Sequence, residues 1–524
     1  MVVKTLLRRN EYKDSVQLMQ AASTAMGLDG VITASLMMGT PNNKKILEES
    51  GLLTSEVNEA SPKDIIISVE AESEDVSDQA IQLAVETLDK TVQSSDGGSE
   101  RQFVSTRGAL EALPNANLVV ISVPGEYAAR ESRLALEHGC NVFLFSDNVS
   151  VEEEVALKKL ATEKGLLVMG PDCGTALVKG KGIGFANVVQ QGKIGVVAAS
   201  GTGLQEVTCL VHQRGQGISH GLGTGGRDVK DAVGGLSVLA GLEALEHDPA
   251  TEIIIIVSKP PQKQTMEAIL GKAQQLSKPV VVNFLGANPK DVEAFDLTPA
   301  TTLEAAAYIA CAWAEGSQET KRYQQWVFDA SKATIKEMIE QTTSEIDPKR
   351  KYVRGLYAGG TFTSETVLVL SELLEGPIYT NVSGGVALED LLTSQEHTVI
   401  DLGEDVFTLG KPHPMIDQTY RKERFHQEMN DPATAVILLD FVLGYGSHED
   451  PVGDMIELVR EARKAGIPVI AHVCGTDLDP QNYKQSVRLL EEANAIVMPT
   501  NAQAARLAAL VATRGNLNLW RNES

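Results

Sequence analysis

Two short turns rich in glycine and hydroxyl residues are the strongest candidates for chemistry. Ser200-Gly201-Thr202-Gly203 follows the apolar run Lys193 to Ala198, and Gly359-Gly360-Thr361 follows a second such run. Both precede a helical pattern. Small residues at a helix start let a ligand approach the first free N–H groups and the positive end of the helix dipole, so each turn is suited to phosphate or carboxylate. A tight turn with an N-cap hydroxyl has the same pattern, and both interpretations stay open.

The two turns belong to an internal repeat. The segments Gly192 to Thr202 and Lys351 to Thr361 both predict a strand, then Gly-Thr-x-x-x-Glu, then a helix. The later matches, in order, are Asp248 to Thr251 with Asp431 to Thr434, and Lys278 to Gly286 with Ile467 to Gly475. Three matches in one order indicate a duplicated domain pair. If the two domains face each other, two helix N-termini can hold one anion from both sides.

A glycine-rich loop follows the short run Gly217 to Leu222. It reads Gly223-Thr224-Gly225-Gly226-Arg227-Asp228. Gly225 and Gly226 allow close backbone approach, Arg227 offers a bidentate fork for phosphate or carboxylate, and Asp228 is expected to steady that fork. A charge-paired surface turn is the alternative interpretation.

A third loop, Met169 to Thr175, ends another buried run. Ligands of open α/β sheets bind at the carboxyl ends of the strands, so Asp172 and the nearby Asn187 are candidate substrate contacts. Cys173 is a possible nucleophile, but no partner histidine is identifiable in the sequence. A packed thiol is therefore favoured.

Two histidines are candidate catalytic groups. His413 lies in Lys411 to Asp417, where prolines on either side fix the backbone, an arrangement that suits a proton donor or an oxyanion contact. A loop histidine bonded to the backbone is the alternative. His448, with Glu449 and Asp450, follows an apolar strand and is suited to orient a substrate. Three adjacent residues cannot easily face one ion, so a capped turn is favoured there and no metal is expected.

Short apolar runs that alternate with helical patterns must position these groups. Runs that are apolar on both faces are typical of buried parallel strands, so the order predicts doubly wound α/β domains. The predicted strands are Asn117 to Val123, Asn141 to Phe145, Leu166 to Met169, Lys193 to Ala198, Glu252 to Val257, Pro279 to Phe284, Ala435 to Asp440 and Pro468 to Val473.

The polar stretch Ser94 to Glu100 marks a first domain boundary. The sequence thus predicts an N-terminal α/β region, a Rossmann-like domain, a first duplicated domain, a polar linker and a second duplicated domain. Their expected ranges are 1–100, 101–189, 190–330, 331–352 and 353–524.

Composition excludes several classes of function. The 524 residues include 46 basic and 70 acidic side chains, and the formal charge of -24 disfavours nucleic acid and anionic membrane surfaces. The longest aliphatic run, Ile253 to Val257, is too short to cross a bilayer, and no secretory signal is visible, so a cytoplasmic location is expected. Five cysteines without CxxC spacing are expected to be reduced. No P-loop sequence is present.

Several strings together resemble a known family. MGPDCGT, the Ser200 turn, GTGGRD and the DPxTE strand resemble the alpha subunit of the succinyl-CoA synthetase superfamily, the NDP-forming acyl-CoA synthetases. With MMGTPNNK, FSDNVSVEEE, KPHPMID and DFVLGYGSHEDP included, nearly the full length is similar to the FdrA family. The resemblance implies a Rossmann-like domain of the CoA-binding type and two duplicated flavodoxin-like, succinyl-CoA synthetase-like domains.

The resemblance also implies a function. Some FdrA members are implicated as subunits of an oxamate carbamoyltransferase in anaerobic allantoin breakdown, with YlbE-like and YlbF-like partner subunits. It implies acyl or carbamoyl transfer through an acyl phosphate or carbamoyl phosphate, in a complex with such partners, a homo-oligomer, or both. In that scheme the two glycine-threonine turns bind phosphate, Arg227 clamps a carboxylate or phosphate, and His413 assists proton transfer.

Two departures from the ligases bear on the activity. The ligases carry phosphate on a histidine shortly after the strand that matches Pro279 to Gly286, whereas the segment Leu285 to Lys290 holds no histidine. Neither an ATP-grasp domain nor the glycine-rich CoA loop is identifiable. Two alternatives stay open: an acyl-CoA synthetase completed by partner subunits, with CoA as a possible ligand, and a non-catalytic scaffold that senses a small anionic metabolite.

Overall fold

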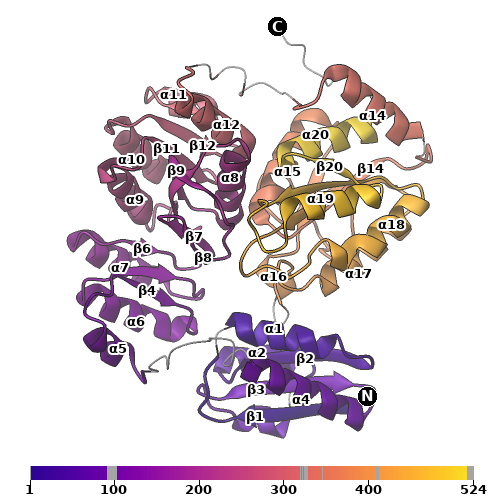
Figure 1. The fold of residues 1–524 in the computed structure, drawn as a ribbon. Coiled ribbons are helices and arrows are strands. Elements are labelled where there is room, and N and C mark those ends of the chain that lie inside the picture. The colour runs from indigo at the N-terminus through magenta and orange to yellow at the C-terminus, as the bar shows by residue number, and fades with distance from the viewer. Residues whose placement is uncertain are drawn as a thin grey trace. The chain divides into compact units, whose positions relative to one another are not determined.

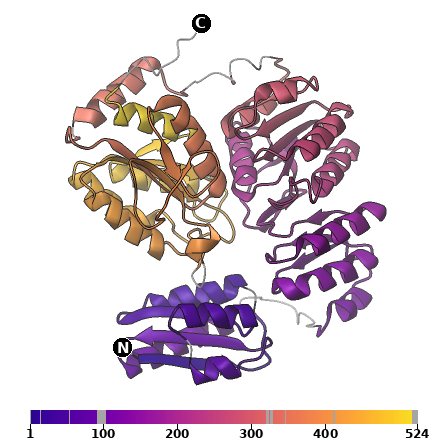
Figure 2. The same cartoon turned by 180° about the vertical axis from the view of Figure 1, so that it is seen from behind.

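The structure is a computed structural model that describes residues 2–13, 15–52, 54–90, 103–318, 320, 323, 328–344, 346–408 and 412–515. It divides into two compact units, one of residues 1–109 with 403–417 and the other of residues 110–402 with 418–524. The boundary stretch Ser94 to Glu100 and the loop residue Lys411 lie outside the described residues. Figure 1 and Figure 2 show the elements of each unit from opposite sides.

The first unit is built on a small antiparallel sheet of order β1-β3-β2. Neighbouring residues of a strand point to opposite faces, so Ile65 and Ile67 of β3 pack under α1 and α4, while Ile66 packs with residues that include Leu47 and Val57 of α2 and α3. The elements are β1 (Val2–Arg8), α1 (Ser15–Met26), β2 (Val31–Met38), α2 (Pro41–Glu49), α3 (Ser55–Glu59), β3 (Ile65–Ala71), α4 (Glu74–Lys90) and α16 (Asp405–Thr408).

Segment 403–417 groups with this first unit, although the sequence placed it within the domain at 353–524. The Ser23 hydroxyl of α1 donates a hydrogen bond to Asp417 at 2.6 Å. Phe407, Met415 and Ile416 are buried. Chain order alone gives no signal that a long connection packs against residues almost 400 positions earlier in the sequence.

Residues 110–170 form a three-stranded parallel sheet in the order β4-β5-β6. The strands follow chain order without a reversal, so the described part of this domain is half of a Rossmann-like fold. It has no topological switch point, the place where doubly wound sheets bind nucleotides. Its elements, preceded by α5 (Thr106–Ala112), are β4 (Leu118–Ile121), α6 (Gly125–Glu137), β5 (Asn141–Leu144), α7 (Val151–Glu163) and β6 (Val168–Met169).

The rest of the second unit contains two seven-stranded sheets, of order β8-β7-β10-β9-β11-β12-β13 and β16-β15-β17-β14-β18-β19-β20. Five parallel strands of each follow the order 2-1-3-4-5, the flavodoxin-like arrangement. The expected duplicated, flavodoxin-like fold is confirmed. β9 and β14 are the first strands of the two copies, and each leads into the helix that begins at a glycine-threonine turn.

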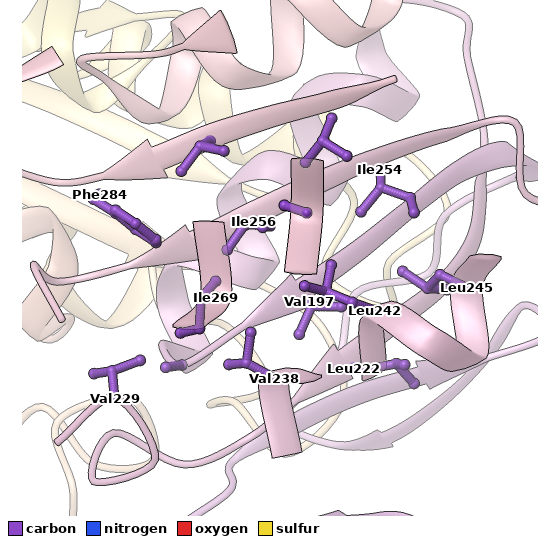
Figure 3. Packing of buried hydrophobic residues seen from close by; sticks show 14 of the residues in the cluster. Val197, Leu222, Val229, Val238, Leu242, Leu245, Ile254, Ile256, Ile269 and Phe284 are labelled. Carbon is purple, nitrogen blue, oxygen red and sulfur yellow. The ribbon is translucent and has the colours of Figure 1, made fainter. Parts of the chain in front are cut away.

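The first copy contains β7 (Thr175–Val178), β8 (Lys181–Gly184), β9 (Gln191–Ala198), α8 (Gly201–Gln213), β10 (Ile218–Gly223), α9 (Leu236–His247), β11 (Ile253–Ser258), α10 (Lys263–Gln274), β12 (Val280–Phe284), α11 (Pro289–Glu293), β13 (Thr298–Pro299) and α12 (Leu303–Ala314). Its main core lies between the sheet and helices α9 and α10, where Val197 and Ile256 meet Leu242 and Ile269 (Figure 3). Helices α8 and α12 pack together and contact the same sheet.

The second copy contains β14 (Tyr352–Tyr357), α15 (Gly360–Leu373), β15 (Ile378–Thr380), β16 (Val386–Ala387), β17 (His397–Asp401), α17 (Thr419–Asn430), β18 (Thr434–Val442), η1 (Gly453–Met455), α18 (Ile456–Lys464), β19 (Val469–Cys474), α19 (Tyr483–Glu492), β20 (Ile496–Met498) and α20 (Asn501–Ala512). Helix α14 (Lys332–Ser344) occupies the expected linker, but Ile335 and Ile339 are buried, so the segment is packed rather than freely solvated.

All eight predicted strands are present, each within a few residues of its expected range. Besides segment 403–417, the start of the first duplicated domain differs from its expected position. The hairpin β7–β8 pairs with β10 and extends the first seven-stranded sheet, so this domain begins near Thr175 and not at 190. Within the described part of the chain, none of the helices combines the length and hydropathy that a membrane span requires.

Candidate functional site

Three loops predicted from sequence meet at the carboxyl edge of the first seven-stranded sheet. A Cβ built on Gly225 would lie 2.2 Å from the carbonyl oxygen of Pro171, and Gly225 has a φ of +79°. A Cβ on Gly223 would lie 2.5 Å from the Cys173 sulfur. These glycines therefore permit contact between the loop after β10 and the loop after β6, while Gly226 lies near the carbonyl of Ala199, just before the Ser200 turn.

The start of α8 is an open helix N-terminus. Ser200 is its N-cap, and the Ser200 hydroxyl accepts a hydrogen bond from Gly203 N at 3.0 Å. In the part of the chain that the structure describes, the N–H groups of Gly201 and Thr202 donate to no protein acceptor. Gly201 is exposed. This terminus offers free donors and the positive end of the dipole to an incoming anion.

The start of α15 lies directly against the start of α8. The hydroxyls of Ser200 and Thr361 are hydrogen-bonded to each other. A Cβ on Gly359 would lie 3.0 Å from the Thr202 methyl group. The structure thus brings together the two turns that the repeat singled out, and both hydroxyls can turn toward one bound group.

Two carboxylates lie beneath the α15 turn. Asp440 of β18 accepts hydrogen bonds from Ala358 N at 2.9 Å and from Arg421 at 2.7 Å through Oδ1, while its buried Oδ2 has no hydrogen-bond partner among the described residues. Burial raises the pKa of Asp440, and the Arg421 guanidinium opposes that rise. Asp401, which ends β17, lies so close to Gly360 that a Cβ there would be 2.5 Å from its carboxylate. The α15 terminus therefore already faces negative charge.

Arg227 has a different partner from the one that the sequence suggested. Asp228 is fully buried, pairs with Lys158 at 2.8 Å, and accepts the N–H groups of Ser237 and Val238 at the start of α9. The Arg227 guanidinium instead donates to the carbonyl of Val149 at 2.7 Å and lies 3.0 Å from Glu154, without hydrogen-bond geometry to that carboxylate. The expected Asp228 support for Arg227 is wrong because Asp228 caps a helix.

Asn187 and Asp172, both candidate substrate contacts, lie in different environments. Asn187 is buried, and its amide donates to Leu443 O at 2.8 Å and to Asp479 at 2.9 Å, so it joins the two duplicated domains. Asp172 is exposed, with a φ of +54°, at the edge where the three loops meet. Only Asp172 of these two keeps a side chain accessible to a ligand.

The candidate histidines are bonded to nearby backbone. His413 belongs to the first compact unit; its Nδ1 accepts from Met415 N at 3.2 Å, and burial lowers its pKa to about 4. His448 Nδ1 accepts from Asp450 N at 3.0 Å within a capped turn, and no metal-binding cluster of three His, Cys, Asp or Glu occurs among the described residues. Both arrangements match the alternatives weighed from sequence. With a lowered pKa, His413 is a neutral imidazole at neutral pH, and its ring N–H is the only proton that it can donate.

The five cysteines are buried, and none of them forms a disulfide in the structure; they are Cys140, Cys173, Cys209, Cys311 and Cys474. Cys173, the one considered as a nucleophile, is buried, and burial raises its pKa to about 12. It is a packed thiol, the interpretation that the sequence favoured.

Sequence reasoning missed one polar contact between the domains. Glu206, on α8, pairs with His472 of β19 at 2.8 Å, and both side chains are about 1 % exposed. The repeated glutamate of Gly-Thr-x-x-x-Glu was a visible signal, since a charged residue recurs at a position that faces the core in both copies. Its partner His472 could not be identified, because the spacing of His472 in the sequence relates it to no other candidate residue.

Comparisons with known proteins agree with this architecture. The CoA-ligase family profile matches residues 356–511, and the profile named "AllF, heavy metal-associated domain" matches residues 1–104. The protein YahF of Escherichia coli is 41% identical over 517 residues, which is 97% of this chain and 98% of YahF.

More distant relatives match about a third of the chain. The alpha subunit of succinate–CoA ligase from Methanothermobacter thermautotrophicus is 27% identical over 36% of this chain and 66% of that subunit. The alpha subunit of malate–CoA ligase from Methylorubrum extorquens is 29% identical over 34% and 62%. Among solved structures, PH0766 of Pyrococcus horikoshii is 14% identical, with a TM-score of 0.30 over 76% of this chain and 85% of that one.

These findings define a class: a multidomain α/β protein that carries a CoA-ligase domain. Within that class, the near-full-length match shows the family. The chain belongs to the FdrA-like family that includes YahF.

The N-terminal profile carries a metal in its name, and the residues do not fit one. Soft heavy metals are bound by thiolates and imidazoles. Residues 1–104 contain neither cysteine nor histidine, since the first histidine is His138 and the first cysteine is Cys140. The N-terminal domain therefore supplies no thiolate or imidazole ligand for a soft metal, and no step of the chemistry passes through one.

Proposed function

We propose that the facing starts of α8 and α15 bind the phosphate of an acyl phosphate or carbamoyl phosphate, and that the protein takes part in acyl or carbamoyl transfer. The observation that carries this proposal is the hydrogen bond between Ser200 and Thr361, which joins the two repeated turns. Free N–H groups of Gly201 and Thr202 supply the donors.

The proposed chemistry needs positioning and charge stabilisation more than a protein nucleophile. An amine or amide nitrogen attacks the carbonyl carbon, the bond from that carbon to the phosphate oxygen breaks, and phosphate leaves with the electron pair. The nitrogen loses its proton to solvent or to the departing phosphate. Helix N–H groups and the two hydroxyls stabilise the charge that develops on the leaving oxygen.

Two features favour this over an autonomous ligase. The loop after β12, Leu285 to Lys290, offers no histidine to carry phosphate. The sheet β4-β5-β6 has no switch point for a CoA or nucleotide to occupy. In this proposal, YlbE-like and YlbF-like subunits or a second copy of the chain contribute the remaining part of the site.

The second candidate is an acyl-CoA synthetase assembled with partner subunits. It is favoured by the CoA-ligase profile at residues 356–511 and by the similarity of about a third of the chain to two ligase alpha subunits. In this case the same helix starts would hold the acyl phosphate formed from a nucleotide, and a partner would supply the nucleotide site.

Binding and turnover separate these candidates. Calorimetry with carbamoyl phosphate is expected to show binding that Ser200→Ala weakens about tenfold, since a hydrogen bond to a charged group contributes about 1.5 kcal/mol. Ser150→Ala is the matched control, because Ser150 is also a helix N-cap, with its hydroxyl bonded to Glu153 N at the start of α7. Absence of binding by the chain, with partners present, would overturn the proposal. CoA-dependent ADP formation in the complex would select the second candidate.

A further inference from the structure

Helices α8 and α15 pack against each other where the two duplicated domains meet, and they bury ionisable side chains there. Glu206 of α8 binds His472 of β19 through Oε2 at 2.8 Å. Glu365 of α15, its counterpart in the repeat, accepts Leu303 N at 2.8 Å and the Asn501 amide at 2.9 Å. Both glutamates are about 1% exposed.

Among the described residues, Glu206 Oε1 is a buried acceptor atom without a hydrogen-bond donor. In the first copy, the buried Asn283 Oδ1 likewise has no donor among them. Asn283 occupies in β12 the position that His472 occupies in β19, as the aligned strands Pro279 to Phe284 and Pro468 to Val473 show. Buried acceptors normally have a hydrogen-bond donor. An acceptor without one indicates that a proton can be bound within this cluster.

The pKa values of Glu365 and His472 are both shifted from their ordinary values. Burial raises the pKa of Glu365 to about 7, with a further rise from Glu206, so the carboxyl is close to half protonated at neutral pH. Burial lowers the pKa of His472, but the Glu206 carboxylate more than offsets this and leaves it above its ordinary value. A small change in the local electrostatic potential can therefore change the protonation of these buried groups.

Other groups also face this cluster and set its background charge. They are Glu304 with Arg506, Asp440 with Arg421, Tyr357, Tyr483, Cys209, Cys474 and Asp479.

The cluster lies one helical turn below the anion site. Glu206 follows Thr202 by four residues and Glu365 follows Thr361 by four, which is about 6 Å along a helix axis. An anion held at the two helix starts adds negative charge near both carboxyl groups, and nearby negative charge favours the protonated form of a carboxyl.

We propose that the buried Glu206–His472–Glu365 cluster is a proton-binding site linked to the anion site, so that an anion binds together with a proton. The inference rests on the proposed function, because it deepens the account of the same site. The proton resides chiefly on Glu365, and the bond that forms is an O–H on its carboxyl group, with the proton drawn from buffer.

Sulfate is the probe, because it stays a dianion across the neutral range and any proton taken up must reside on the protein. Calorimetric titration of the full chain at pH 7.5, in buffers of different ionisation enthalpy, is expected to show uptake of roughly half a proton per sulfate. Affinity is expected to weaken about tenfold between pH 6 and pH 9.

Two variants test the assignment. Glu365→Gln mimics the protonated carboxyl, so it is expected to abolish proton uptake and flatten the pH profile while sulfate still binds. His472→Asn installs the residue found in the first copy; loss of a neighbouring positive charge favours protonated Glu365 and is expected to shift the profile to higher pH. Glu457→Gln, on the surface of α18, is the control and is expected to leave both unchanged.

The outcomes separate the two proposals. If sulfate, phosphate and carbamoyl phosphate all fail to bind at every pH, also with partners present, the proposed function is wrong. If sulfate binds without proton uptake, or if Glu365→Gln retains full uptake, the proton linkage is wrong and the anion site stands.

Discussion

The two copies of the duplicated domain share a strand order but differ at the helix start that follows their first strand. Helix α8 begins with the capping hydroxyl of Ser200, whereas α15 begins at Gly359, which provides no side-chain cap. The difference continues beneath the turns. Asp440 in β18 corresponds to Val257 in β11, and Asp401 at the end of β17 corresponds to Gly223 at the end of β10.

This comparison shows how a symmetric scaffold can produce an asymmetric site. Negative charge near a helix N-terminus compensates the dipole. The α15 terminus has Asp401 and Asp440 close by, so its attraction for a second anion is weakened. The α8 terminus has no such neighbour at the equivalent positions. We therefore expect α8 to supply most of the anion affinity and α15 to supply mainly the Thr361 hydroxyl.

The largest effect is expected when Asp440 is replaced by valine, the residue at the corresponding position of the first domain. Asp440→Val leaves the buried Arg421 guanidinium without its carboxylate, and removal of one member of a buried ion pair costs about 3–5 kcal/mol. Chemical denaturation is the measurement. The double variant Asp440→Val with Arg421→Met removes both charges and is expected to recover most of the loss. A single variant as stable as the parent would show that the carboxylate is dispensable to the fold.

The next largest effect is expected from acid, which should destabilise the second duplicated domain more than the first. Burial, with help from Arg354, lowers the pKa of His397 to about 4, and its Nδ1 accepts Val353 N at 3.1 Å. The unfolded chain binds a proton near pH 6.5 and the folded chain does not, so stability is present above that pH and is lost as the pH falls toward 4. The full shift corresponds to about 3 kcal/mol.

Hydrogen exchange at pH 7 and pH 5 measures this difference by region. Protection is expected to fall more in β17, which contains His397, and in its neighbour β14 than in β9 and β10 of the first domain. His397→Gln keeps an acceptor for Val353 N and is expected to remove the extra acid sensitivity. Equal losses in the two sheets would contradict the prediction.

The sequence predicted what depends on neighbouring residues in the chain. Apolar runs identified the buried strands, and the Ser-Gly-Thr spacing identified the start of α8, because strand burial and helix capping are local properties. The facing of Ser200 and Thr361 followed from the repeat once the domains were assumed to meet. The repeat thus predicted a contact between two residues that lie about 160 positions apart in the sequence.

What the sequence could not predict depends on tertiary contacts. Asp228 is adjacent to Arg227 in the chain, yet it turns inward to Lys158 and the start of α9. The proline-flanked His413 was expected to act on substrate, but it is half-buried in the first compact unit and its ring accepts the Met415 N–H. A polar residue in a loop has the same appearance in sequence whether it binds a ligand or the backbone.

A smaller effect is expected from weakening the charge near α15. Asp401→Asn removes a carboxylate beside Gly360 and is expected to strengthen sulfate binding about fivefold, or about 1 kcal/mol, because a negative charge near the anion is lost. Asp291→Asn, on the exposed face of α11, makes the same chemical change elsewhere and is expected to have no effect. Weaker sulfate binding by Asp401→Asn would show that Asp401 organises the α15 turn and does not repel the ligand.

The smallest effect is expected at Arg227, and it tests whether the first domain needs a cationic side chain at all. Its guanidinium is held by the Val149 carbonyl and lies beside Glu154, so its charge is largely offset within the protein. Arg227→Ala is therefore expected to change carbamoyl phosphate affinity less than twofold in calorimetry, while the contact with the β4-β5-β6 domain loosens. A tenfold loss of affinity, with Arg227→Lys restoring only part of it, would instead establish the bidentate clamp and would place a second source of anion affinity on the α8 side.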